Sequence, residues 1–253
     1  MTIVGQEVEW QPKADLLVIR DRVQANQPKF QANANEGKYL SRKQQLDLWG
    51  KITALASDPR LAMQTEHITW LVKEQKVIGD RSTQIQRYRE NTITAKVSTN
   101  TFTTELDRKI IKLQGKVRLD STNPLIRVDG ESFDWNLDRE TIVAERPLTI
   151  LHPPEALTFN ANSGTLDLKG SSVAVLAGNA TGVSTRNQAK LRADRLIWEI
   201  ASQRLTGTGN VVYQQVDPAI KFTGTRGVGK LQDRSIVVSG DGKQRVQTEF
   251  IPQ

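Results

Sequence analysis

The stretch DRLIWEIASQRLTGTGNVVYQQVD, at residues 194–217, carries apolar or glycine residues at alternate positions on both sides of a polar tetrapeptide. Leu196, Trp198 and Ile200 precede the tetrapeptide, and a second alternating series begins at Leu205. Alternation with a period of two is typical of a half-buried strand, and a short polar stretch between two such series is typical of a hairpin turn. The stretch therefore predicts two antiparallel strands joined near residues 201–204.

The same pattern recurs along the chain. Four tryptophans share one position in it: Trp10, Trp70, Trp135 and Trp198. An apolar residue lies two positions before each of them, at Val8, Ile68, Phe133 and Leu196, and another lies seven positions after, at Leu17, Val77, Ile142 and Leu205. A weaker copy lies halfway between, with anchors Tyr39, Thr104, Phe159 and Gly229 and a glycine eleven residues after each, at Gly50, Gly115, Gly170 and Gly240. The repeat predicts about eight hairpins, or about 16 strands.

Register predicts which faces these residues share. A one-residue slip turns a strand's side chains to the opposite face, so equal positions in the repeat imply an equal face. The simplest arrangement places alternate hairpins on two facing sheets, with all four tryptophans on one of them.

A rival assignment is an amphipathic helix over residues 38–56, which helix propensity alone allows. The repeat favours a strand pair there. No Gly-, Ser- or Pro-rich linker interrupts the chain, so residues 1–253 are expected to form a single elongated domain.

Composition excludes several kinds of site. The chain has no cysteine, which removes thiol catalysis, cysteine-bound zinc and disulfides. Its two histidines, His67 and His152, have no ligand partners at metal-binding spacing. Residues 224–230, GTRGVGK, match the start of a phosphate-binding loop, but Leu231 replaces the required Ser or Thr, and a turn between strands is the favoured interpretation. We expect no catalytic residues, no metal and no cofactor.

The chain carries a net charge of +7 with the cationic residues dispersed. Such a surface favours anionic partners in general. No stretch is long and apolar enough for a transmembrane helix, and residues 1–10 do not have the pattern of a signal peptide.

Residues 68–80, ITWLVKEQKVIGD, and residues 194–217 resemble segments of the OstA-like lipopolysaccharide-transport proteins, the family of LptA, LptC and the N-terminal domain of LptD. Through the repeat the resemblance extends over essentially the whole chain, and it is strongest in residues 60–80 and 190–245. It implies an all-β, elongated open antiparallel β-jellyroll with two facing sheets and a V-shaped groove. It also implies a non-enzymatic role in the periplasm, where acyl chains of lipopolysaccharide lie in the groove and pass from an inner-membrane ABC transporter complex towards the outer membrane.

The resemblance further implies that other OstA-like bridge proteins join edge to edge by β-augmentation, and it implies no nucleic-acid partner. The end strands near Gly5–Trp10 and Arg245–Ile251 are the expected edges. Eight hairpins exceed the usual length of LptA or LptC, and both types stay open. Met1 falls inside a repeat unit, which favours a long LptC-type protein that lacks an N-terminal anchor to the inner membrane.

Candidate groove residues follow from the repeat. They are Val8, Trp10, Ile68, Trp70, Phe133, Trp135, Leu196, Trp198 and Leu205. The inward face that packs two sheets together also suits an apolar ligand. Two alternatives are a structural or adhesion repeat protein of the cell envelope with a dry core, and a polysaccharide-acting β-solenoid enzyme. The solenoid requires parallel coils and a carboxylate cluster, whereas the hairpin turns predict antiparallel pairing.

Overall fold

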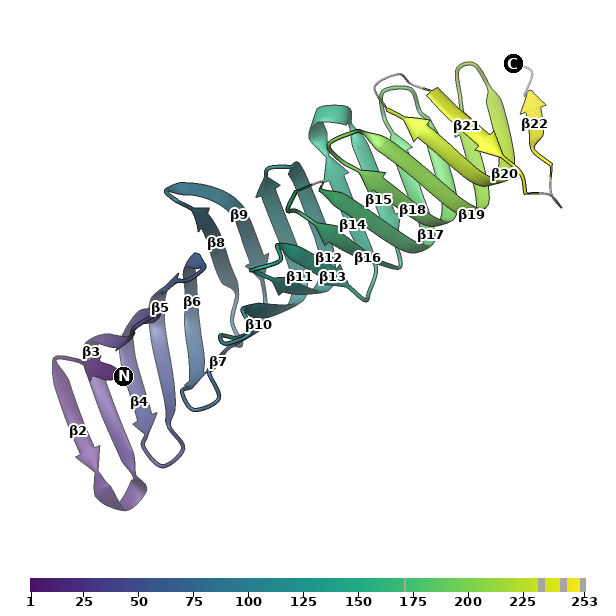
Figure 1. Cartoon of the computed structure of the whole chain (residues 1–253). Coiled ribbons are helices and arrows are strands. Elements are labelled where there is room, and N and C mark those ends of the chain that lie inside the picture. The colour runs from purple at the N-terminus through teal and green to yellow at the C-terminus, as the bar shows by residue number, and fades with distance from the viewer. Residues whose placement is uncertain (171, 232–234, 242–244, 251–253) are drawn as a thin grey trace. The chain divides into compact units, whose positions relative to one another are not determined.

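The computed structural model describes residues 1–170, 172–231, 235–241 and 245–250. Within these ranges the chain forms 22 strands and two short 3₁₀ turns, Pro12–Ala14 and Pro153–Glu155 (Figure 1). The strand pairings of the described residues are antiparallel, as in β17 with β18 and β19 with β20. The predicted all-β antiparallel class is confirmed, and the rival helix over residues 38–56 is wrong because β4 (Phe30–Leu40) and β5 (Gln45–Ser57) cover it as strands.

The chain divides into two compact units. Unit 1 comprises Met1–Leu119 and Asp134–Asp138, and unit 2 comprises Asp120–Phe133 and Arg139–Gln253. The further strands of unit 1 are β1 (Thr2–Val4), β2 (Glu7–Gln11), β3 (Leu16–Gln27), β6 (Arg60–Leu71), β7 (Lys76–Gly79), β8 (Thr83–Arg89), β9 (Thr92–Thr99) and β10 (Thr101–Glu105). Strands β11 (Ile110–Thr122) and β12 (Leu125–Asn136) contribute residues to both units. The single domain over residues 1–253 stays a prediction.

Unit 2 contains the remaining strands. They are β13 (Thr141–Ala144), β14 (Leu148–His152), β15 (Leu157–Ala161), β16 (Ser163–Asp167), β17 (Val173–Ser184), β18 (Lys190–Glu199), β19 (Arg204–Gln215), β20 (Ile220–Lys230), β21 (Ser235–Ser239) and β22 (Gln247–Phe250). The segment that resembles a phosphate-binding loop lies inside β20, in extended conformation. The interpretation of that segment as a turn between strands is therefore wrong, because residues 224–230 continue the strand.

Each long strand contributes to two layers. The first part of β3, residues 16–20, pairs with β2, and its later part pairs with β1. A register shift separates the two parts, between Arg20 and Val23. We call layer A the strand parts that carry the repeat anchors, such as residues 67–71 in unit 1 and 195–199 in unit 2. Layer B is formed by the other parts, such as residues 30–34 in unit 1 and 180–184 in unit 2.

The bend between the layers has a recurrent backbone conformation. Two consecutive residues have positive φ at Asp21–Arg22, Gly50–Lys51, Gly115–Lys116, Gly178–Asn179 and Gly209–Asn210. At Gly50 an added Cβ would lie 2.8 Å from the Asn35 amide nitrogen on the neighbouring strand, so the position lacks room for a side chain as well as requiring φ of +77°. Alternate hairpins on separate sheets were therefore the wrong arrangement, because these corners carry each long strand from one layer into the other.

The repeat anchors form a row across layer A. In unit 1, direct pairs connect Trp10, Leu17, Tyr39, Leu46, Trp70, Val77, Thr104 and Ile111 in that order. In unit 2, direct pairs connect Ile142, Leu166, Ala174, Trp198, Leu205, Gly229 and Ile236. Phe159 is the exception, since it lies in layer B and pairs with Ile150 and Gly182. Within each unit, the anchors named above thus lie along one row of layer A, apart from Phe159.

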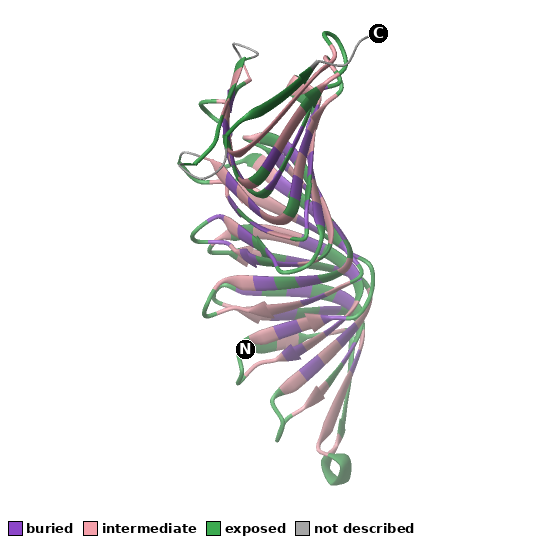
Figure 2. Ribbon diagram, turned by 90° about the vertical axis from the view of Figure 1, so that its right-hand side faces the viewer, coloured by how far each residue is buried: buried purple, intermediate pink, exposed green. Residues whose placement is uncertain are grey.

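The core of each unit lies between its layers. The rings of Phe30 in layer B and Trp70 in layer A are 4.7 Å apart in unit 1, and those of Phe159 and Trp198 are 4.7 Å apart in unit 2. Along the strands, buried residues alternate with exposed ones (Figure 2). This alternation is what the period-two pattern of the sequence requires, and it places the anchor row on the inward face.

Candidate functional site

Seven of the nine candidate groove residues are buried. Trp70, Trp135 and Trp198 are at most 1% exposed, and Ile68, Phe133, Leu196 and Leu205 are also buried. Val8 and Trp10 differ, with exposed fractions of 53% and 49%. Both lie on β2, which pairs with β3. Val8 and Trp10 are thus about half exposed on this edge strand, and Trp10 holds its predicted place in the row. That these nine residues contact lipid stays a prediction.

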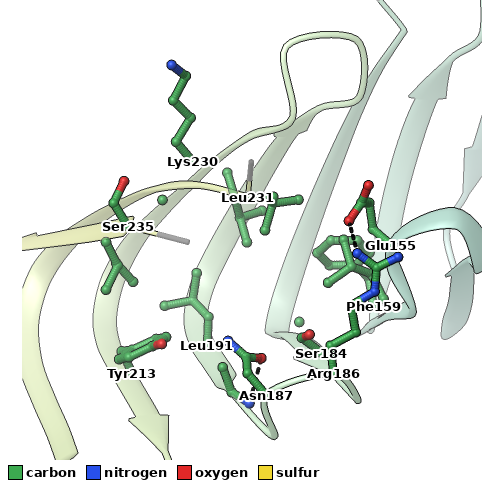
Figure 3. A pocket seen from close by; sticks show the side chains of 16 residues that line it. Glu155, Phe159, Ser184, Arg186, Asn187, Leu191, Tyr213, Lys230, Leu231 and Ser235 are labelled. Carbon is green, nitrogen blue, oxygen red and sulfur yellow. Dashed lines mark hydrogen bonds and ion pairs between the residues drawn. The ribbon is translucent and has the colours of Figure 1, made fainter. Parts of the chain in front are cut away.

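A cavity of about 140 Å³ lies between the two layers of unit 2 (Figure 3). Layer B contributes Leu157, Phe159, Leu191 and Tyr213 to its wall. Layer A contributes Leu205, Gly229 and Ile236. Apolar side chains from both layers thus line part of the cavity, and Leu205 is the candidate residue from the sequence that reaches it.

The wall of the cavity also carries charged groups, which lie in turns and at strand ends. A guanidinium nitrogen of Arg186 is 2.8 Å from a carboxylate oxygen of Glu155, and Arg186 also donates to the carbonyl of Pro154. Gln203 donates to Glu155 over 3.4 Å, and this bond connects a turn of layer A with a turn of layer B. Lys230 lines the cavity as well, with its side chain directed away from the apolar wall (Figure 3).

Two buried ring nitrogens lie behind the cavity wall. The ring of His152 meets that of Trp198 edge-on, with centroids 5.1 Å apart. His152 Nδ1 and Trp198 Nε1 are both buried, and the described residues offer neither of them a hydrogen-bond partner. Burial lowers the pKa of His152, since the charged imidazolium loses its hydration. His152 is thus a neutral packing residue at neutral pH.

Two other titratable groups of the described residues have shifted pKa values. Nδ1 of His67 lies 2.8 Å from an Asp80 carboxylate oxygen, and this contact lowers the pKa of Asp80. Burial raises the pKa of Tyr213, whose hydroxyl donates to Gln215. Within the described part of the chain, no three His, Asp or Glu side chains gather in a way that could hold a metal ion.

Sequence reasoning missed several residues of the cavity. Phe159 and Gly229 were recognised as weaker anchors of the repeat but not as site residues. Tyr213 belongs to the alternating series that follows Trp198, and that series was the available signal for it. Arg186 and Glu155 lie in separate turns, and no local pattern connects them.

Comparison with known proteins bears on unit 1. Residues 15–118 match the model of a family described as "LptC: Lipopolysaccharide-assembly, LptC-related". The resemblance to OstA-like lipopolysaccharide-transport proteins therefore has the support of a family match over residues 15–118, which lie within unit 1. For residues 190–245 the resemblance stays a prediction.

Among solved structures, the chain is similar to LptH of Pseudomonas aeruginosa, described as the LptA homologous periplasmic component of the conserved lipopolysaccharide transport device. The two chains are 16% identical, and the match covers 50% of this chain and 95% of LptH with a TM-score of 0.45. No curated protein matches the chain. In the described residues, no helix is long and apolar enough to cross a membrane.

Proposed function

We propose that this protein is a non-enzymatic scaffold of lipopolysaccharide transport, in which acyl chains lie between the two layers. The observation that carries the proposal is the cavity between layers A and B of unit 2, with its apolar wall, in a chain whose residues 15–118 match the LptC-related family model. Hydrocarbon tails need a water-excluded apolar wall, and this cavity supplies one from both layers. Transfer of a lipid between proteins requires no bond to form or break, so no catalytic group is needed.

The charges fit an anionic lipid. Two cations, Arg186 and Lys230, line the cavity together with one carboxylate, Glu155. Phosphate and carboxylate head groups bind Arg and Lys through charge-assisted hydrogen bonds at the water interface, while their tails leave the water. The chain as a whole carries a net charge of +7.

The proposal includes a location and partners. The protein would function in the periplasm, anchored to the inner membrane, and would receive lipopolysaccharide from an inner-membrane ABC transporter complex. Its partners in the onward path would be other OstA-like bridge proteins, joined at exposed strand edges by β-augmentation. Strand β2 is one such edge, and β22 is another candidate, while Ile251 of the expected last strand lies outside the described residues.

Photocrosslinking with lipopolysaccharide tests this function. A photoreactive residue replaces Leu205, whose side chain lines the cavity, and in a matched variant it replaces Thr206, the next residue along the strand. We expect crosslinks from position 205 and few from position 206, because successive residues of a strand face opposite sides. Equal crosslinking from both positions, or none from either, would contradict the proposal and would favour a structural repeat protein with a dry core.

A further inference from the structure

The anchor row contains two positions where a large ring is replaced by a small residue. In unit 1, Trp70 pairs with Val77, and Val77 pairs with Thr104, which is the next anchor in the row. In unit 2, Trp198 pairs with Leu205, and Leu205 pairs with Gly229, the next anchor in that row. The two units therefore repeat the same order of a tryptophan and then a small residue.

A cavity lies at each small anchor. The one at Thr104 is about 40 Å³ and is also lined by Val77, Ile111 and Phe30. The one at Gly229 is about 140 Å³ and is lined at the corresponding places by Leu205, Ile236 and Phe159. Phe30 and Phe159 are the ring partners of Trp70 and Trp198, respectively. The cavity volume rises as the anchor side chain shrinks from Thr to Gly.

The backbone conformation at position 229 does not require a glycine. Its φ lies outside the left-handed region, and an added Cβ would meet only the Ser235 carbonyl oxygen, at an ordinary 3.5 Å. Gly79 shows the opposite case, since a Cβ there would overlap the ring of Phe102. A larger residue at position 229 thus fits the strand and would project between the layers. The structural effect of glycine at this position is to leave space.

We infer that Gly229 sets the size of a pocket for the end of one acyl chain, with Phe159 in its wall and Trp198 packed behind Phe159. A cavity of about 150 Å³ with an apolar wall can take a small apolar molecule, and the Gly229 cavity is of that size with Leu205, Phe159 and Ile236 in its wall. The Arg186 and Lys230 cations beside one carboxylate favour a chain that carries an anionic head. The inference rests on the proposed function, because lipopolysaccharide supplies such chains.

The test uses dodecanoic acid brominated at its terminal carbon, which quenches the fluorescence of a tryptophan a few ångströms away, such as Trp198 behind Phe159. The wild-type protein should show quenching, and Trp198→Phe should lose most of it. Gly229→Leu should weaken binding at least tenfold and remove the quenching, while its melting temperature stays the same or rises because the cavity is filled. Gly229→Ala, which adds one methyl group, should give an intermediate effect. Val228→Leu, the adjacent residue on the other face of β20, is the matched control and should bind as wild type does.

Wild-type binding and quenching in Gly229→Leu would overturn the inference, as would quenching that survives in Trp198→Phe. A Gly229→Leu chain that fails to fold would leave the decision to Gly229→Ala, whose unchanged binding would equally overturn it. Lipopolysaccharide crosslinking from position 205 separates this result from the proposed function. Crosslinks that persist in Gly229→Leu at the wild-type level would retain the transport role and reject the pocket. Fatty-acid quenching without any lipopolysaccharide crosslinks would retain the pocket and reject the transport role.

Discussion

Trp198 connects the two layers of unit 2. Its indole contacts Phe159 and His152 of layer B, and no part of its side chain is exposed. Trp70 has the same position in unit 1 and contacts Phe30. Trp10, at the first position of the row, is 49% exposed and belongs to the edge strand β2. Equal positions in the sequence repeat thus differ in burial according to which neighbours cover them.

Trp70→Ala should lower the free energy of unfolding by about 3–5 kcal/mol, because it removes a fully buried ring from a packed core. Trp10→Ala is the control and should cost less than about 1 kcal/mol, since a surface substitution loses few contacts. Denaturation in urea measures both values. Similar costs for the two variants would show that burial does not distinguish these positions.

Gly50→Ala should destabilise the protein by more than about 1 kcal/mol, because alanine is strained at positive φ and its Cβ would press on Asn35. Gly229→Ala is the matched substitution without either constraint and should be neutral or slightly stabilising. Thermal unfolding of the two variants gives the comparison. A loss of stability in Gly229→Ala as large as in Gly50→Ala would contradict the role given to the corner.

His152 makes stability depend on pH. Its pKa is lowered in the folded state by burial, so below the ordinary value of 6.5 the unfolded chain binds more protons than the folded one. The contribution of His152 is therefore fully present above pH 6.5 and is lost as the pH falls towards the lowered value. His152→Phe should flatten the fall in melting temperature between pH 7 and pH 5, and a wild-type slope in that variant would exclude His152 as the cause.

Local pattern predicted the row but not the corners or the cavity. Alternation around Trp198 identifies strands because the inward face repeats every two residues. The corner at Asp21–Arg22 has the same conformation as Gly50–Lys51 without a glycine, so no single residue type marks it. The cavity exists because Gly229 has no side chain and because layer B residues, distant in the sequence, form the opposite wall. The packing between layers determines this space, and the periodicity of one strand contains no information about that packing.

At the scale of elements, β2 is an edge strand with two exposed apolar residues. Val8 and Trp10 are both about half exposed, and Val4 on the adjoining β1 is 52% exposed. An edge strand carries unpaired backbone groups that another strand can satisfy. Apolar side chains along such an edge suit association with a second chain more than permanent contact with water.

Val8→Lys combined with Trp10→Lys should abolish end-to-end association while the fold is retained, because charge on an edge strand opposes pairing. Leu55→Lys is the control, since Leu55 is 54% exposed but lies on β5, between two neighbouring strands. Light scattering after size-exclusion chromatography measures the association, and circular dichroism checks the strand content. Undiminished association of the double variant would remove β2 from the interface.

At the scale of the whole molecule, most pairings connect strands that are close in the chain. Strands β3, β4, β5 and β6 pair successively, and so do β17, β18, β19 and β20. When each hairpin depends mainly on its neighbours, stability is approximately a sum of local terms and unfolding need not be all-or-none. The two compact units are expected to respond separately to a local loss of packing.

Hydrogen exchange followed by mass spectrometry tests this locality. Trp70→Ala should reduce protection in strands β3 to β6 and leave β17 to β20 near wild type, and Trp198→Ala should do the reverse. The wild-type protein supplies the reference for each strand. Loss of protection throughout the chain in either variant would instead indicate one cooperative structure.

The corners between layers also determine which changes of length the chain tolerates. Deleting one residue between a corner and its hairpin turn would reverse the inward and outward side chains of that strand part, while the same strand's other part kept its register. Gly209–Asn210 therefore separates two independent registers within β19. Duplication or loss of a complete hairpin conserves both registers, so descendants of this sequence are expected to differ in length by whole hairpins rather than by single residues.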